Sequence, residues 1–260
     1  MPVYLVAGEP LFAARHRSAR AGAVALVLIH GAGGSHLHWG GAVRVLPKAE
    51  VFALDLPGHG RSGGAGLTTV AQYSSAVMSF LDVIGVEQAV LAGHSMGGAI
   101  AQTTALEFPD RVRGLVLVGT GSRLRVLPRI LEGTLSDYAA TVELICQSAY
   151  SENAPAELVR MGRKQMLRVP AQVLHDDFAA CNAFEITDRL GEIRCPTLVV
   201  CGTEDRLTPP KYSTFLAERI PGAQLVLVEG AGHMVMIEKE RQVAEAMSSW
   251  LTELEPPTKQ

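Results

Sequence analysis

The stretch AVLAGHSMGGAIAQTTALEFP (residues 89–109) begins as an apolar run, continues as a helix-like segment and ends at a proline. At the junction it holds Gly93, His94, Ser95, Met96 and Gly97, which match the pattern Gly-x-Ser-x-Gly. Between a strand and a helix, this pattern is typical of a sharp turn that strains the serine and raises its hydroxyl above a sheet. We therefore predict that Gly93 and Gly97 are required because side chains there would collide.

Ser95 has a structural interpretation and a catalytic one. Serine is a favoured N-cap residue, so Ser95 could simply cap the helix that follows it. As a nucleophile, it would need a base oriented by a carboxylate, because a serine hydroxyl attacks weakly at neutral pH. In that case the backbone amide of Met96, at a helix N-terminus, is predicted to stabilise developing negative charge.

The chain offers an acid and a histidine after Ser95, each behind an apolar run. TLVVCG precedes TEDRLTPP, which places Asp205 in the loop after a strand, and AQLVLVEG precedes AGHMV, which places His233 in the next such loop. The order Ser95, Asp205, His233 is the one associated with this serine turn. All three are expected beyond the C-terminal ends of strands, where open α/β sheets place their sites. Glu204 is the alternative to Asp205.

The loop HGAGGSHLHW (residues 30–39) follows an apolar run and is predicted to complete an oxyanion hole. Its small residues would let the amide of Ala32 face Ser95 alongside the amide of Met96. The loop lacks the third glycine of a dinucleotide fingerprint and the Gly-Lys-Ser/Thr of a P-loop. We therefore predict no cofactor.

The remaining histidines have structural interpretations. His94 is expected to point away from the cleft, and His30 and His59 adjoin glycine turns where structural hydrogen bonds are expected. His36 and His38 resemble half of a metal site but have no third ligand nearby, so we predict no metal.

Three acidic residues outside the proposed triad are also expected to be structural. Asp55, at the end of an apolar run, is expected to hold the loop LPGHGRS. Asp176 and Asp177, with His175, are expected to form a solvated helix face.

The whole chain predicts an α/β fold with a mostly parallel central sheet and helices on both faces. Apolar runs alternate with helical patterns, which implies parallel strands covered on both sides. The last helix is predicted from Val243, Met247, Trp250, Leu251 and Leu254 at helical spacing, and the tail EPPTKQ cannot continue it. The predicted strands lie in AVALVLIH, VFALDLPG, AVLAG, VRGLVLVG, CPTLVVCG and AQLVLVEG.

Between residues 122 and 187 the strand pattern gives way to helical stretches such as PRILEGTLSDYAATVELICQSAY and ELVRMGRKQMLRV. We interpret this segment, called the cap segment below, as a helical insertion between two parts of the core, residues 1–121 and 188–260. Its apolar faces pack on the core or line a pocket that suits small to medium acyl groups. At its start, Arg123, Arg125 and Arg129 either bind a polar end of the substrate or form a solvated face.

Composition limits the functional class. The 260 residues are 48% hydrophobic with a net charge of −3, which predicts small-molecule chemistry and no nucleic-acid partner. The four cysteines have no paired spacing and favour a reducing, cytoplasmic compartment. The N-terminal sequence shows neither a signal peptide nor a spanning helix, so no membrane partner is expected. Monomer and homo-oligomer are equally compatible with the sequence.

Five segments in order resemble the α/β-hydrolase superfamily, and within it small serine esterases and enol-lactonases. They are HGAGGSHLHW, DLPGHGRS, GHSMGG, GTEDRLTP and GAGHMVMIE. Serine at position 95 argues against haloalkane dehalogenases and epoxide hydrolases, which have aspartate there. The resemblance implies hydrolysis of a carboxylic ester through an acyl-enzyme, with Ser95 as nucleophile, His233 as base and Asp205 as orienting acid. The alternatives are thioester, lactone or carbon–carbon bond hydrolysis, or a ligand receptor on a hydrolase scaffold.

Overall fold

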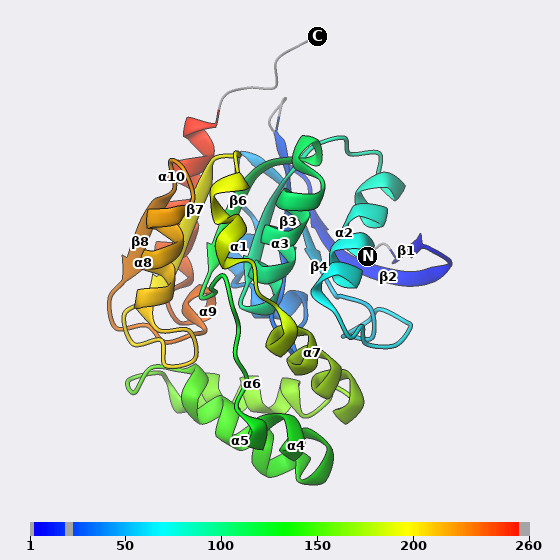
Figure 1. The fold of residues 1–260 in the computed structure, drawn as a ribbon, viewed down its shortest axis with the longest axis vertical. Helices are drawn as coiled ribbons and strands as arrows, with labels where there is room; N and C mark the ends of the chain where they lie inside the picture. The colour runs from blue at the N-terminus through cyan, green and yellow to red at the C-terminus, as the bar shows by residue number, and fades with distance from the viewer. Residues whose placement is uncertain (1–2, 19–22, 255–260) are drawn as a thin grey trace.

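The computed structural model describes residues 3–18 and 23–254, so the tail EPPTKQ, which is predicted not to continue the last helix, lies outside the described residues. The described residues form a sheet of eight strands in the order β1-β2-β4-β3-β5-β6-β7-β8 (Figure 1). The strands are β1 Val3–Val6, β2 Glu9–His16, β3 Val24–Ile29, β4 Ala49–Leu54, β5 Ala89–His94, β6 Val112–Val118, β7 Thr197–Gly202 and β8 Gln224–Val228. The six strands predicted from apolar runs are confirmed, and all pair in parallel.

The sequence pattern did not reveal the two strands at one edge of the sheet. β1 pairs antiparallel with β2 through a tight turn at Ala7 and Gly8, whose φ angles are 51° and 88°. Two successive positive φ angles are typical of the hairpin turns that match strand twist. β2 then pairs antiparallel with β4, so the sheet is mixed at this edge and parallel elsewhere.

Helices cover both faces of the sheet, as predicted. One face is covered by α2 Val70–Val83, α3 Met96–Glu107 and α8 Pro210–Arg219, and the other by α1 Gly41–Arg44, α9 Val235–Glu238 and α10 Glu240–Glu253. The expected face of α10 is buried at Val243, Met247, Trp250 and Leu251. Burying a side chain of this size contributes about 2 kcal/mol, so α10 is held mainly by its contact with the sheet.

The cap segment contains four helices that gather beyond one end of the sheet in Figure 1. Asp137 separates the first two by accepting a hydrogen bond from the N–H of Ala140, which caps the second helix. The helices also share a small apolar cluster of their own, distinct from the two clusters beside the sheet. The bounds are α4 Pro128–Ser136, α5 Tyr138–Ala149, α6 Ala156–Met166 and α7 Ala171–Ala183. The division of the core at residues 121 and 188 stays a prediction.

Two further findings bear on the sequence-based expectations. None of the helices in the described part of the chain is both long and apolar enough to cross a membrane. The four cysteines are free thiols, and burial raises the pKa of Cys146 and Cys195 to about 11. At neutral pH these two thiols are therefore protonated and poor nucleophiles.

Candidate active site

The turn between β5 and α3 has the strained geometry that the glycine pattern predicts. Ser95 has φ 53° and ψ −116°, a region that residues other than glycine rarely adopt. A Cβ atom on Gly93 would overlap the backbone of Gly97, and one on Gly97 would overlap the carbonyl of Ile29. The hydroxyl of Ser95 makes no capping hydrogen bond, so the interpretation of Ser95 as a side-chain N-cap is wrong.

The backbone of Ser95 is held from the neighbouring strand β6. Its N–H donates to the carbonyl of Val118 at 2.9 Å, and its carbonyl accepts the hydroxyl of Thr120 at 2.8 Å. Thr120 is fully buried and also lies against Gly98, where a Cβ would not fit. These contacts fix the strained turn while leaving the Ser95 side chain unbonded, and the sequence carried no local sign of the role of Thr120.

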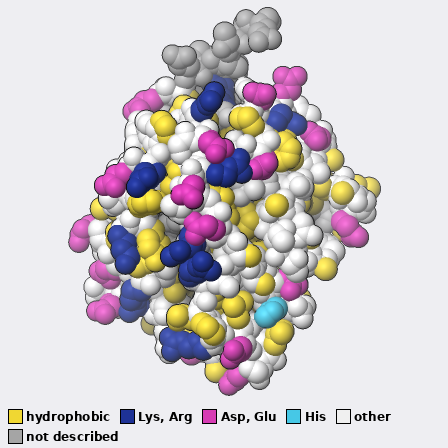
Figure 2. All heavy atoms as spheres, in the orientation of Figure 1, with side chains coloured by type: hydrophobic (Ala, Val, Ile, Leu, Met, Phe, Trp, Pro, Cys, Tyr) yellow, Lys and Arg dark blue, Asp and Glu magenta, His cyan; other side chains and the backbone are white. Residues whose placement is uncertain are grey.

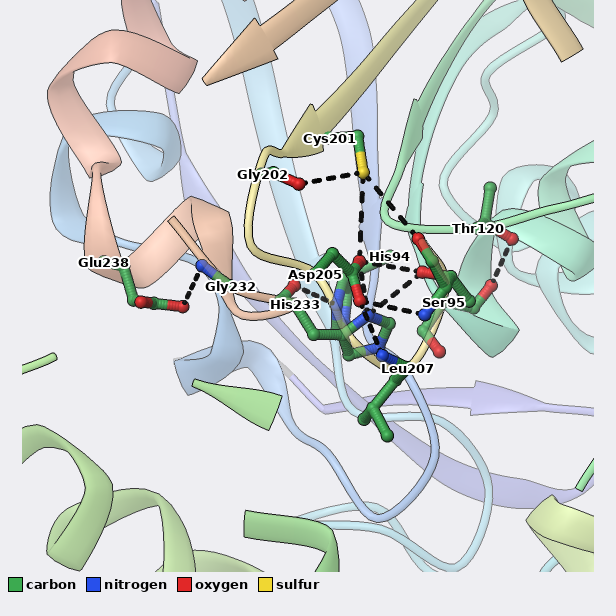
Figure 3. Close-up of polar contacts among 11 residues, drawn as sticks. His94, Ser95, Thr120, Cys201, Gly202, Asp205, Leu207, Gly232, His233 and Glu238 are labelled. Atoms are coloured by element: carbon green, nitrogen blue, oxygen red, sulfur yellow. Dashed lines mark hydrogen bonds and ion pairs between the residues drawn. The ribbon is translucent and has the colours of Figure 1, made fainter. Parts of the chain in front are cut away.

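Asp205 and His233 follow β7 and β8 and face each other, as Figure 3 shows. The Nδ1 of His233 lies 2.9 Å from the Oδ2 of Asp205, and both residues are buried. A carboxylate only accepts hydrogen bonds, so this contact places the imidazole proton on Nδ1 and leaves Nε2 able to accept a proton. This is the relation that a base and its orienting acid require.

Thr208, which sequence reasoning missed, helps to fix the carboxylate of Asp205. The Oδ1 atom accepts the N–H groups of Leu207 at 2.9 Å and Thr208 at 2.8 Å, while the Thr208 hydroxyl donates to Oδ2 at 2.8 Å. The same hydroxyl oxygen lies 3.1 Å from Nδ1 of His233. An Asp followed by such a turn is a recognisable local pattern, so the segment DRLT held a usable signal.

The electrostatics of Asp205 favour its ionised form. Burial would raise its pKa, but the facing charge of His233 and the hydrogen bonds from His233 and Thr208 outweigh burial and lower it. Glu204, the alternative acid, instead accepts the N–H of Glu152 at 3.2 Å. Among the described residues, Asp205 is therefore the acid that contacts His233.

His94 contacts the backbone carbonyl of His233. Its Nε2 lies 3.0 Å from the carbonyl of His233, and the two rings are 4.6 Å apart. Burial lowers the pKa of His94 well below its ordinary value, and the neighbouring His233 adds to this effect. His94 is thus a neutral donor that positions the His233 loop, and it does not line the cavity described next.

Ser95 and His233 line one cavity of about 440 Å³ between the sheet and the cap segment. Ala32 lines the same cavity, and no backbone acceptor in the described chain bonds the N–H of Ala32 or Met96. Met96 is the first residue of α3, where the N–H has no partner within the helix. The two amides predicted to form the oxyanion hole are therefore available as donors.

The prediction of a solvated helix face at His175, Asp176 and Asp177 is wrong, because none of the three residues is exposed. Asp177 is fully buried, and His175 is half-buried with Nδ1 at 3.1 Å from both the Thr134 hydroxyl and the Leu131 carbonyl. Periodicity could not reveal this, because α7 Ala171–Ala183 packs against other elements on more than one side.

Asp55 holds its loop, as expected, and also holds the loop after β3. It accepts the N–H of Arg61 at 2.9 Å and the N–H and Nδ1 of His36 at 2.6 and 2.8 Å. Burial would raise the pKa of Asp55, but the hydrogen bonds from His36 and Arg61 lower it. No group of three or more metal-binding side chains occurs within residues 3–18 and 23–254.

The sequence model of the alpha/beta hydrolase family matches residues 26–246 of this chain. The chain belongs to the alpha/beta hydrolase family. This hydrolase is 34% identical to a thermophilic esterase of solved structure, with a TM-score of 0.86 over 97% of each chain. The expected resemblance and fold class are thereby confirmed.

Two further proteins are similar to this hydrolase, one in structure and one in sequence. The crystal structure of the enol-lactonase from Burkholderia xenovorans LB400 matches this hydrolase with a TM-score of 0.89 at 23% identity, over 97% of this chain and 100% of that one. A dihydrolipoyllysine-residue acetyltransferase component of the acetoin cleaving system of Pseudomonas putida is 32% identical over 241 residues. The match covers 88% of this chain but only 64% of the length of that relative.

Proposed function

We propose that this hydrolase cleaves small to medium carboxylic esters through an acyl-enzyme on Ser95. The observation that carries the proposal is the contact of 2.9 Å between Nδ1 of His233 and Oδ2 of Asp205. His233 lines the same cavity as Ser95, whose backbone is strained and whose hydroxyl makes no capping hydrogen bond. The likeness to an esterase at 34% identity supports the same reaction class.

In the proposed mechanism, Nε2 of His233 accepts the proton of Ser95 as Oγ attacks the ester carbonyl. The oxyanion that forms accepts hydrogen bonds from the amides of Ala32 and Met96. His233 then gives the proton to the leaving alcohol, and Asp205 stabilises the transient imidazolium. Water, activated by His233, hydrolyses the acyl-enzyme, releases the acid and restores Ser95.

Replacement of the nucleophile tests the proposal. Ser95→Ala should reduce the turnover of a nitrophenyl ester by several orders of magnitude, about 10⁶-fold in a comparable triad, with melting temperature almost unchanged. Ser75→Ala is the matched control, because Ser75 is exposed on α2 and bonds only the carbonyl of Ala71. Mass spectrometry of the wild-type enzyme during turnover should find an acyl adduct on Ser95. A Ser95→Ala enzyme with near-normal rate would remove Ser95 from the mechanism.

The cavity also supports the expected range of acyl lengths. A volume of about 440 Å³ lies at the lower end of the range for small-molecule sites. Each buried methylene contributes about 0.8 kcal/mol, or roughly fourfold in kcat/KM, until the cavity is full. In a graded series of nitrophenyl esters, kcat/KM should therefore rise and then fall before long-chain lipids are reached. A steady rise to long chains would contradict a small cavity.

The alternatives on the same triad are hydrolysis of a thioester, a lactone or a carbon–carbon bond. Matched oxygen and sulfur esters with one acyl group separate the first of these from ester hydrolysis. The alternative of a ligand receptor predicts ligand-induced thermal stabilisation of the wild type without turnover. Cytoplasmic location, which the free cysteines favour, remains part of the proposal.

A further inference from the structure

The cavity that contains Ser95 is strongly cationic in a chain of negative net charge. Its lining includes Arg123, Arg125, Arg129 and Arg206 but no aspartate or glutamate, whereas the chain as a whole carries a net charge of −3. Figure 2 shows Lys and Arg side chains beside apolar ones where the cap helices meet the rest of the molecule. The charge of this site is therefore opposite in sign to the charge of the protein.

Two of the four arginines have structural partners. Arg206 donates from one nitrogen to the carbonyls of Gln147 and Tyr150 at 2.6 and 2.9 Å, at the C-terminal end of α5. Arg123 forms an ion pair with Glu185 at 3.4 Å. These contacts account for the presence of Arg206 and Arg123 without a ligand.

Arg125 and Arg129 are exposed side chains of the lining, and the charge of Glu185 acts on Arg125 as well as on Arg123. Neither forms a hydrogen bond or an ion pair with any residue that the structure describes, although both line the cavity. Arg129 lies in the first turn of α4 Pro128–Ser136, where the helix dipole opposes a positive charge. Local folding therefore disfavours this arginine, and its placement is explained if the cavity receives an anion.

The rest of the lining is mainly apolar. Aliphatic and aromatic side chains from the cap segment cover much of the space near Ser95, namely Leu124, Val126, Ile130, Leu144, Ile145 and Phe178. An apolar wall suits a hydrocarbon chain, and a guanidinium matches the two oxygens of a carboxylate. Together they suit a ligand with an apolar middle and one anionic end.

We propose that the substrate is a monoester of a dicarboxylic acid, whose free carboxylate is bound by Arg125 and Arg129. This inference rests on the proposed ester hydrolysis at Ser95. Ser95 Oγ bonds to the ester carbonyl, the alcohol leaves with the proton that His233 supplies, and the acyl-enzyme keeps the distal carboxylate. Water then cleaves the acyl-enzyme, so ester and water give a dicarboxylic acid and an alcohol.

A matched pair of substrates tests the proposal, the mono-4-nitrophenyl ester of adipic acid and 4-nitrophenyl hexanoate. The two differ only in a terminal carboxylate in place of a methyl group. The wild type should favour the anionic ester in kcat/KM by about tenfold or more, the effect of one charge-assisted hydrogen bond. This preference should shrink as salt is added. Equal or faster hydrolysis of the neutral ester would overturn the inference and leave ester hydrolysis intact.

Substitutions locate the effect. Arg125→Gln and Arg129→Gln should each lower the ratio of anionic to neutral kcat/KM by about tenfold, mainly through KM. Arg160→Gln is the control, since Arg160 is an exposed cap residue that pairs with Glu157 and does not line the cavity. A ratio that stays constant in both cavity variants would overturn the assignment of these arginines.

Binding of adipate to Ser95→Ala, measured by calorimetry, separates this inference from the proposed chemistry. Adipate should bind Ser95→Ala, and it should bind at least tenfold more weakly when Arg125→Gln and Arg129→Gln are added. This result would support the anion site even if Ser95 proved not to be the nucleophile. Absence of adipate binding would overturn the inference whatever the esterase assays show.

Discussion

Asp177 on α7 accepts a hydrogen bond from the backbone N–H of Gly33 at 2.8 Å, which joins the cap segment to the loop that carries Ala32. The same buried carboxylate accepts Nε2 of His59 at 2.8 Å and the hydroxyl of Tyr73 at 2.6 Å. Burial would lower the pKa of His59, but Asp177 outweighs burial and raises it. One anion thus connects the cap segment with three parts of the core.

Asp177→Asn should destabilise the protein by about 2 kcal/mol, because it removes the charge from hydrogen bonds that a buried carboxylate strengthens. For a chain of this size, that corresponds to a fall in melting temperature of roughly 4–8 °C. Asp176→Asn is the matched control, since its carboxylate bonds only Gln172 at the surface. If the two variants melt together, Asp177 does not join the cap segment to the core energetically.

Asp205→Asn should lower kcat by a factor on the order of 10⁴, because an amide no longer fixes the His233 tautomer or stabilises the imidazolium. Glu204→Gln should change kcat by less than about threefold, since the side chain of Glu204 contacts the N–H of Glu152 and not His233. The measurement is steady-state hydrolysis of a nitrophenyl ester. The opposite ranking would move the acid to Glu204.

Thr208→Val should lower kcat by about tenfold with little change in KM, because it removes the hydroxyl that donates to Oδ2 of Asp205. Thr208→Ser keeps the hydroxyl and should recover most of the activity. Activity that is kept in Thr208→Val and lost in Thr208→Ser would mean that Thr208 acts through the packing of its methyl group and not through its hydroxyl.

His38 makes the fold sensitive to acid. Burial, together with the charge of His59, lowers the pKa of His38 from 6.5 to about 4. As pH falls below 6.5, His38 therefore becomes protonated in the unfolded chain before it does so in the folded protein. The free energy of unfolding consequently decreases between pH 6.5 and pH 4. The loss amounts to about 3 kcal/mol.

Denaturant unfolding of the wild type and of His38→Asn between pH 7 and pH 4 checks this effect. The asparagine variant should lose less stability over this range than the wild type. A residual slope is expected, because burial also lowers the pKa values of His30 and His94. Parallel curves for the two proteins would show that His38 does not titrate with unfolding.

Local sequence rules were sufficient for most of the fold and for the candidate triad. Continuous apolar runs indicate strands that are buried on both faces, and a serine between glycines at the end of a strand indicates a strained turn. Both patterns are readable from sequence because each depends on residues that are neighbours in the chain. The same rules missed β1 and β2. Val3 and Leu5 of β1 are exposed at the sheet edge, so the strand lacks the buried apolar run that marks the others.

The sequence by itself determined the six parallel strands, the strained turn at Ser95 and the order of Ser95, Asp205 and His233. Only the tertiary structure decided that Asp177 is buried, since its partner Gly33 lies 144 positions away and no periodicity encodes such a contact. It also decided that Arg125 and Arg129 line the cavity of Ser95. Short-range steric rules act between neighbours in the chain, whereas burial and charge at a site depend on which distant segments the packed sheet and helices bring together.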